Sequence, residues 1–135
     1  MGDSSQNEQT GRRFLESINR GDRAALRELL ASDVIRLVPK SASAPYAGEH
    51  RGAEQVIDLM LSAVANSFDA AGVRHEVRLA LADGDWVMLE TVMCGTHVDG
   101  RRYENEYVFL LRMTGDRIAE IREHVDTAYA VRFFG

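Results

Sequence analysis

An alternation of apolar and polar residues runs through the second half of this chain and constrains its fold more than any other feature. Four segments carry this two-residue repeat, at residues 73–82, 86–97, 102–113 and 117–126. Short turn sequences separate them, each containing a Gly next to an Asp, and such turns join neighbouring antiparallel strands. The pattern therefore predicts an antiparallel meander.

Apolar residues at helical spacing predict three helices ahead of these strands. The helices are expected at about residues 9–20, at residues 22–32, and from Ala53 past Val64. The segments between them are interpreted as an edge strand at residues 34–38, which stops at Pro39, and as loops at residues 40–52 and 68–72.

Helices followed by strands make an α+β arrangement, in which the helices cover one face of the sheet. The segment 86–97 is apolar on both faces, so its second face needs cover as well. We expect that cover to be a second copy of the chain, bound through the outer sheet face as a homodimer. The alternative is that the C-terminal segment, which contains Phe133 and Phe134, folds back over this face.

Composition places the chain among ordinary folded proteins. Its 135 residues are 45% hydrophobic and 27% charged, enough for one domain, expected at residues 10–135 after a disordered tail at residues 1–9. A net charge of −5 without a basic cluster argues against nucleic acid, and no apolar run is long enough to cross a membrane. The N-terminus lacks the apolar core of a signal peptide and Cys94 is the only cysteine, which favours a cytoplasmic location.

One carboxyl group lies on the otherwise apolar face of the last strand. Glu123 alternates in phase with Ala119, Ile121 and Val125. Burial raises the pKa of a carboxyl group, which suits general acid/base catalysis near neutral pH. A three-residue turn would place Tyr107 opposite this residue. The polar residues on the helix-covered face are expected to be His75, Thr91, His97, Tyr103, Asn105, Tyr107 and Glu123.

Several polar residues have a second interpretation. Glu123 could form a purely structural ion pair with Arg36 or Arg51, and either arginine could instead bind a substrate anion. His97 lies near a strand end, where a bulge would turn it towards solvent. The four histidines show no close metal-ligand spacing and there is no glycine-rich phosphate loop, so neither a metal nor a cofactor is expected.

The order of elements and four motifs resemble the nuclear-transport-factor-2-like superfamily, which includes ketosteroid isomerases and SnoaL-like polyketide cyclases. The motifs are FLESINRGD at residues 14–22, LASDVIRLVP at 30–39, GEHRGAEQV at 48–56 and GDRIAEIREHVDT at 115–127. The resemblance implies a single SnoaL-like domain with a cone-shaped, cystatin-like fold. In that fold three N-terminal helices pack on a curved, mixed but mostly antiparallel sheet, with a ligand pocket between them and commonly a dimer.

The catalytic residues of ketosteroid isomerases are missing from this chain. Those enzymes use an aspartate before the proline that ends the first strand, where this chain has Val38. Their tyrosine of the first helix corresponds to Phe14, and their second aspartate falls near Phe109. All three positions are apolar here, so the chain is not a standard ketosteroid isomerase.

The final hairpin is also similar to that of limonene-epoxide hydrolases and of phenazine-biosynthesis A/B proteins. The hydrolases carry a catalytic aspartate at the position of Glu123, but their arginine and aspartate partners correspond to Thr91 and Met93. The phenazine proteins use a glutamate acid/base at the matching place. The resemblance therefore implies chemistry at Glu123 without selecting a reaction.

Two functions follow as hypotheses. The first is a cofactor-independent enzyme, of isomerase, cyclase, dehydratase or epoxide-hydrolase type, acting on a small apolar organic molecule through Glu123, Tyr107 and His97. The second is a non-catalytic protein that binds a small ligand in the same pocket. In both cases the expected ligand contacts are Tyr103, Asn105, Phe14, Arg36, Val38, Thr91, Met93 and Phe109.

Overall fold

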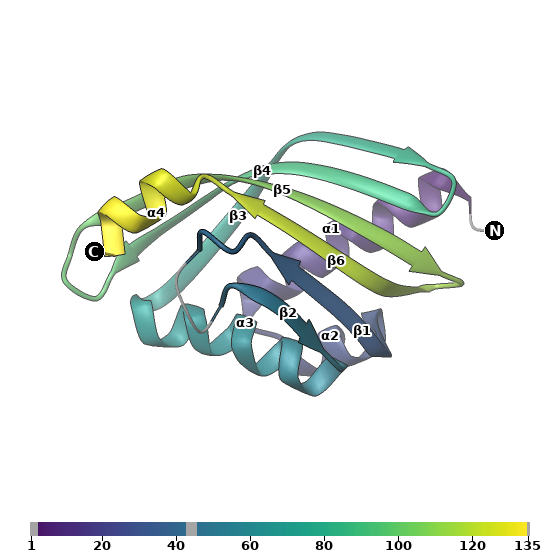
Figure 1. Cartoon of the computed structure of the whole chain (residues 1–135), viewed down its shortest axis with the longest axis horizontal. Coiled ribbons are helices and arrows are strands. Elements are labelled where there is room, and N and C mark those ends of the chain that lie inside the picture. The colour runs from purple at the N-terminus through teal and green to yellow at the C-terminus, as the bar shows by residue number, and fades with distance from the viewer. Residues whose placement is uncertain (1–2, 43–45, 135) are drawn as a thin grey trace.

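The strands form one curved sheet, and helices cover one of its faces (Figure 1). This computed structural model describes residues 3–42 and 46–134. Residues 1–2 of the expected tail and 43–45 of the expected loop lie outside the described residues. The elements are α1 (Ser4–Arg20), α2 (Arg23–Leu29), β1 (Leu30–Val38), β2 (Gly48–Arg51), α3 (Ala53–Ser67), β3 (Phe68–Asp83), β4 (Trp86–His97), β5 (Arg102–Thr114), β6 (Arg117–Val125) and α4 (Thr127–Phe134).

The sheet is mixed but mostly antiparallel, as predicted. Its strand order is β2-β1-β6-β5-β4-β3, and β1 and β6 pair in parallel while the other neighbouring pairs are antiparallel. The predicted α+β, cystatin-like architecture is confirmed, with α4 as a helix beyond the three that were expected.

The expectation that residues 34–38 form an edge strand was wrong. Residues 48–51 of the predicted loop form β2, which pairs with β1 and places Arg36 opposite His50. β1 therefore lies between β2 and β6. Gly48, the first residue of β2, and Gly52, which follows the strand, have φ of +93° and +90°, a conformation that glycine adopts readily. A strand of four residues is too short to show a clear alternation in the sequence.

Helix α1 begins at Ser4, so the expectation of a disordered tail was wrong from residue 4 onward. The Asp3 side chain accepts a hydrogen bond from the backbone N–H of Ser5 and caps the helix. Asn7 is buried, and its side-chain amide donates to the carbonyl of Gly84, 3.2 Å away in the β3–β4 turn. These polar residues bond to protein groups, which composition alone does not reveal.

Helix α1 lies close against the sheet at Gly11. A Cβ atom there would lie only 3.2–3.3 Å from side-chain atoms of Leu89, Leu111 and Val87. One turn later, Phe14 packs edge-on against Phe109 with ring centroids 6.2 Å apart. These contacts join α1 to side chains of β4 and β5.

An irregularity in β3 reverses the predicted facing of its second half. β3 carries one residue more than β4 at Arg78, which forms a β-bulge. Unbroken alternation from His75, which was expected on the covered face, would place Leu79 and Leu81 on that face too, but they are 47% and 57% exposed. Ala80 and Ala82 pack against the core in their place.

Helix α4 closes one end of the covered side. The rings of Phe133 and Phe134 lie 4.9 and 5.2 Å from that of Tyr103, and both also contact the ring of His97. Tyr103 belongs to the buried cluster against which Val64 of α3 packs. The alternative that the C-terminal segment covers the outer face is therefore wrong.

The outer face keeps a row of apolar side chains. Leu81 of β3 pairs with Met88 of β4, which pairs with Leu110 of β5. Leu81 is exposed, and the other two are half-buried. We call Leu81, Met88 and Leu110 the outer row.

Candidate functional site

A cavity of about 410 Å³ lies between the covered face of the sheet, α3 and α4. Most of its wall is apolar, and a volume of this order suits a small organic molecule. The polar side chains in the wall are Arg36, Tyr46, Ser67, His75, Tyr103, Tyr107 and Glu123. A second hollow of about 470 Å³ lies on the outer face beside Glu90 and Glu106. Most residues that were predicted to carry chemistry line the first cavity, so it is the candidate site.

Glu123 of β6 forms an ion pair with Arg36 of β1. Arg36 Nε and Nη2 both donate to Glu123 Oε1, at 3.1 and 2.9 Å, and the side chains are only 6% (Arg36) and 12% (Glu123) exposed. Within the described residues, no donor bonds to the other carboxylate oxygen, Oε2, and no acceptor bonds to the buried nitrogen Nη1. Because Glu123 lines the cavity, its unused Oε2 is available to a ligand, whereas Arg36 Nη1 is enclosed and has almost no accessible surface.

The hairpin pairing differs from the prediction by two residues. Glu123 lies opposite Phe109, whereas Tyr107 had been expected there. The turn has two residues, 115–116, and a register shift follows in the hairpin. A shift of two residues leaves every side chain on its face, so Tyr107 still lines the cavity.

A chain of hydrogen bonds runs from the backbone to the cavity through two tyrosines. The Asn105 side-chain oxygen accepts from the Glu106 N–H, which fixes the amide, and Nδ2 donates to the Tyr103 hydroxyl at 2.8 Å. The Tyr103 and Tyr107 hydroxyl oxygens lie 2.9 Å apart. Tyr103 is buried, and within the described chain Tyr107 is the one acceptor its proton can reach. We therefore assign Tyr103 as donor, which leaves the Tyr107 proton free to point into the cavity.

Both tyrosines are donors at neutral pH. Burial raises the pKa of Tyr103, and burial raises the pKa of Tyr107 well above its ordinary value. The negative charge of Glu123 raises the pKa of Tyr107 further, and the positive charge of Arg36 acts in the opposite direction. Tyr107 and the ion pair line the same cavity, so their charges influence one another.

His75 is a neutral member of the same wall. Its Nδ1 lies 3.0 Å from the hydroxyl oxygen of Thr91, and its ring packs edge-on against Tyr107 and Phe109. Burial lowers the pKa of His75 to about 3, so the ring is uncharged at neutral pH. Thr91 is fully buried, and this nitrogen is the one partner its hydroxyl has among the residues described. We assign Thr91 as donor, which places the imidazole proton on Nε2.

The structure brings most of the predicted site residues to the cavity. The wall includes Arg36, Val38, Met93, Tyr103, Tyr107, Phe109 and Glu123. Three others are buried behind it and contact wall residues. Phe14 packs on Phe109, Thr91 bonds to His75, and Asn105 bonds to Tyr103.

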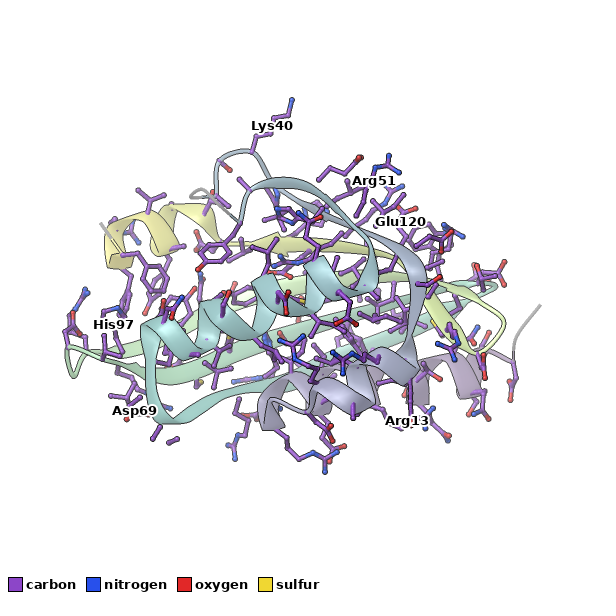
Figure 2. The ribbon with its side chains drawn as sticks, turned by 90° about the horizontal axis from the view of Figure 1, so that it is seen from below. Arg13, Lys40, Arg51, Asp69, His97 and Glu120 are labelled. Atoms are coloured by element: carbon purple, nitrogen blue, oxygen red, sulfur yellow. The ribbon has the colours of Figure 1, made fainter. Side chains whose placement is uncertain are left out.

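Two of the candidate residues lie elsewhere. His97 is placed beside α4 at one end of the molecule (Figure 2), with Nδ1 2.9 Å from an Asp99 oxygen. It does not line the cavity, so its position gives no support to the predicted catalytic role. Arg51, the second candidate partner of Glu123, pairs with Glu49 at the surface instead.

Three helices supply wall residues that were not predicted to line a site. They are Ile18 of α1, Met60, Ala63, Val64 and Ser67 of α3, and Ala130, Val131 and Phe134 of α4. The apolar stripe of α3 was the available signal, but a helix that only packs against a sheet shows the same pattern. Helix α4 has only eight residues and gave no comparable signal.

Metal and membrane features are absent from the part of the chain that the structure describes. In these residues, no three His, Cys, Asp or Glu side chains gather closely enough to hold a metal ion. None of the helices there is both long and apolar enough to cross a membrane.

The sequence of the chain matches the SnoaL-like domain family over residues 11–121. The chain therefore belongs to this family, whose solved relatives share the nuclear-transport-factor-2-like fold predicted above. A search of curated proteins gave no match.

Three solved structures illustrate the similarity. A nuclear-transport-factor-2-like protein of unknown function from Burkholderia pseudomallei is 26% identical, with a TM-score of 0.81 over 94% of this chain and 95% of its own. IdmH from Streptomyces antibioticus, a proposed polyketide cyclase, is 24% identical, with a TM-score of 0.81 over 96% and 99%. Bal32a, from a soil-derived mobile gene cassette, is 21% identical, with a TM-score of 0.84 over 98% of both chains. At these identities the last two show the fold alone.

Proposed function

We propose that this protein is an enzyme that moves a proton on a small, largely apolar organic substrate, with Glu123 as the general base and acid. The unused oxygen of Glu123 carries this proposal. Arg36 occupies Oε1 with two hydrogen bonds, while Oε2 has no protein donor among the described residues and belongs to a cavity wall. A carboxylate oxygen in a site of low polarity is a strong proton acceptor once a substrate excludes water.

The neighbouring side chains support the same chemistry. As Glu123 Oε2 takes a proton from the substrate, the bonding electron pair stays on the substrate and negative charge develops there. The Tyr107 hydroxyl, fixed by Tyr103, donates a hydrogen bond that stabilises this charge. Return of the proton from Glu123 to a second substrate atom completes an isomerisation, and its delivery to a leaving hydroxyl completes a dehydration.

A second candidate function is ligand binding without catalysis. The Arg36–Glu123 pair favours it, because nearly buried ion pairs with good geometry are often structural. In that case the cavity would hold a ligand and Glu123 would only balance the charge of Arg36.

Hydrogen–deuterium exchange separates the two functions without knowledge of the natural substrate. The probes are α-tetralone and similar small ketones in D₂O, and ¹H NMR follows loss of the protons next to the carbonyl. We expect the wild-type protein to accelerate exchange and Glu123→Gln to return it to the buffer rate. The matched control is Glu104→Gln, which removes an exposed carboxylate on the neighbouring strand and should exchange like the wild type.

Two results would contradict the enzyme proposal. One is full exchange activity in Glu123→Gln. The other is a wild-type protein that binds the ketones but exchanges them no faster than buffer, which would support the binding function instead.

We also propose that the protein is a homodimer through the outer face of the sheet. The outer row of Leu81, Met88 and Leu110 supports this, because helix α4 packs on the other side and leaves these side chains partly in solvent. A contiguous apolar row on a sheet face is typical of a subunit contact.

A further inference from the structure

His75 has a ring nitrogen that meets the candidate cavity. Its Nδ1 is held by the hydroxyl of the fully buried Thr91. The two nitrogens of an imidazole point to different sides of the ring, so Nε2 is directed away from Thr91. Among the described residues no group bonds to Nε2, yet unlike Arg36 Nη1 this atom is not enclosed. His75 is only 8% exposed and lines the cavity, which places the accessible surface of Nε2 in the cavity wall.

The hydrogen bond to Thr91 decides what Nε2 can do. The Thr91 hydroxyl donates its proton to Nδ1, which leaves the single ring proton on Nε2. Burial lowers the pKa of His75 to about 3, so the ring stays uncharged at neutral pH. Nε2 is therefore a neutral N–H donor. Buried polar groups in proteins rarely lack a partner, and a fixed donor in the wall of an apolar cavity is suited to bond to a bound molecule.

The Tyr107 hydroxyl is a second neutral donor in the same wall. The rings of His75 and Tyr107 contact each other edge-on, with centroids 5.2 Å apart. Each side chain is also fixed by a hydrogen bond, His75 by Thr91 and Tyr107 by Tyr103. Two fixed donors that converge on one oxygen stabilise negative charge on it effectively, because neither has to reorient as the charge develops.

We propose that His75 is a catalytic residue whose Nε2–H donates a hydrogen bond, together with the Tyr107 hydroxyl, to the substrate oxygen on which negative charge develops. The inference rests on the proposed function, in which Glu123 removes the proton that creates this charge. His75 keeps its own proton throughout, so the transferred proton moves between the substrate and Glu123 alone.

The exchange assay with α-tetralone tests this role by substitution. His75→Phe keeps an aromatic ring against Tyr107 and removes the donor. We expect kcat for exchange to fall about a hundredfold and KM to stay within about threefold of the wild type, because the lost bond strengthens in the transition state. The control is His124→Phe at an exposed position of the outer face, which should exchange like the wild type. Wild-type exchange in His75→Phe would overturn the proposal.

A second variant separates the donor from the shape of the ring. The amide of His75→Gln retains one acceptor, for the Thr91 hydroxyl, and N–H donors for the substrate. We expect this variant to exchange at least about ten times faster than His75→Phe. Equal losses in the two variants would mean that the ring contact matters and the donor does not, which would overturn the assignment.

NMR of the wild-type protein gives a readout that does not depend on the folding of a variant. In protein labelled with ¹⁵N-histidine, long-range ¹H–¹⁵N spectra show which ring nitrogen carries the proton. We expect the His75 proton on Nε2, with its signal shifted by α-tetralone and unchanged by tetralin, the matched hydrocarbon. A proton on Nδ1, or identical responses to both molecules, would contradict the proposal.

The role of His75 and the enzyme proposal fail in different ways. Glu123-dependent exchange that is unaffected in His75→Phe would refute only the role of His75. A wild-type protein in which α-tetralone shifts the Nε2 signal, but exchanges no faster than in buffer, would refute the enzyme proposal and leave His75 as a donor to a bound ligand.

Discussion

Glu123 is both half of an ion pair and a cavity residue with an unused oxygen. An isolated charge on a covered strand face costs several kcal/mol, and Arg36 offsets that cost at Oε1 alone. If Arg36 bonded both oxygens, neither would remain for a substrate. The distribution of hydrogen bonds over the two oxygens therefore decides what the pair can do.

His75 predicts a loss of stability in acid. Its pKa is lowered by burial from 6.5 to about 3, so the folded protein leaves the ring neutral in a range where the unfolded chain binds a proton. The free energy of unfolding should be unaffected by His75 above pH 6.5. It should fall as pH drops from 6.5 towards 3, by up to about 1.4 kcal/mol per pH unit.

Urea unfolding at several pH values tests this prediction. His75→Gln should show a shallower decline between pH 6.5 and 4 than the wild type, whatever its stability at neutral pH. The control is His124→Gln at an exposed position, which should keep the wild-type slope. An unchanged slope in His75→Gln would mean that other groups cause the acid sensitivity.

Much of the site could be predicted because strand alternation assigns side chains to faces. Glu123, Tyr103 and Tyr107 were placed on the covered face without knowledge of the hairpin register, and a register error of two residues did not change that. The Arg36 partnership remained one of two alternatives, because it depends on the parallel pairing of β1 with β6. His97 was misplaced, because alternation does not reveal where a side chain lies along the sheet.

At the level of elements, Gly11 sets the distance between α1 and the sheet. Gly11→Val would force branched atoms against Leu89, Leu111 and Val87, and we expect it to lower the free energy of unfolding by about 1–3 kcal/mol. Gly11→Ala should change stability less, because its better helix propensity offsets a contact that flexible side-chain ends can relieve. Chemical denaturation measures both.

The control for this prediction places the same residue type on the solvent side of the helix. Gln9→Val introduces a β-branched residue in α1 at an exposed position, so it reports helix propensity without a contact to the sheet. If the Gly11 and Gln9 variants lost the same stability, close packing at Gly11 would not be the cause.

Long periodic elements were predictable and short or interrupted ones were not. Helices α1 and α3 and strands β4, β5 and β6 follow from sequence periodicity, since each is long enough to repeat its pattern. The second helix was predicted to run to residue 32, but α2 ends at Leu29 and β1 begins at Leu30. β2 has four residues, and its pairing with β1 is a long-range contact. The start of α1 depends on Asn7 reaching a distant turn. Tertiary contacts of this kind leave no local pattern.

At the scale of the whole molecule, the outer row predicts the assembly state. We expect the wild-type protein to sediment as a dimer and Met88→Glu to sediment as a monomer. The new carboxylate would lie in the centre of the outer row and would lose its water between the subunits. Val98→Glu adds the same charge at an exposed turn position and should remain dimeric. A monomeric wild type at micromolar concentration, or a dimeric Met88→Glu, would contradict assembly through this face.

The extra residue at Arg78 also affects how this chain should be aligned with its relatives. Beyond the bulge, Leu79 pairs with Glu90 and Ala80 with Leu89. A relative lacking the extra residue could keep both pairings, because only the unpaired position would be lost. A one-residue gap in the relative at Arg78 is therefore compatible with an unchanged core. An alignment without that gap would match inner positions of one protein with outer positions of the other along the rest of β3. Comparisons of this strand across the family should be anchored on its partners in β4 rather than on its own alternation.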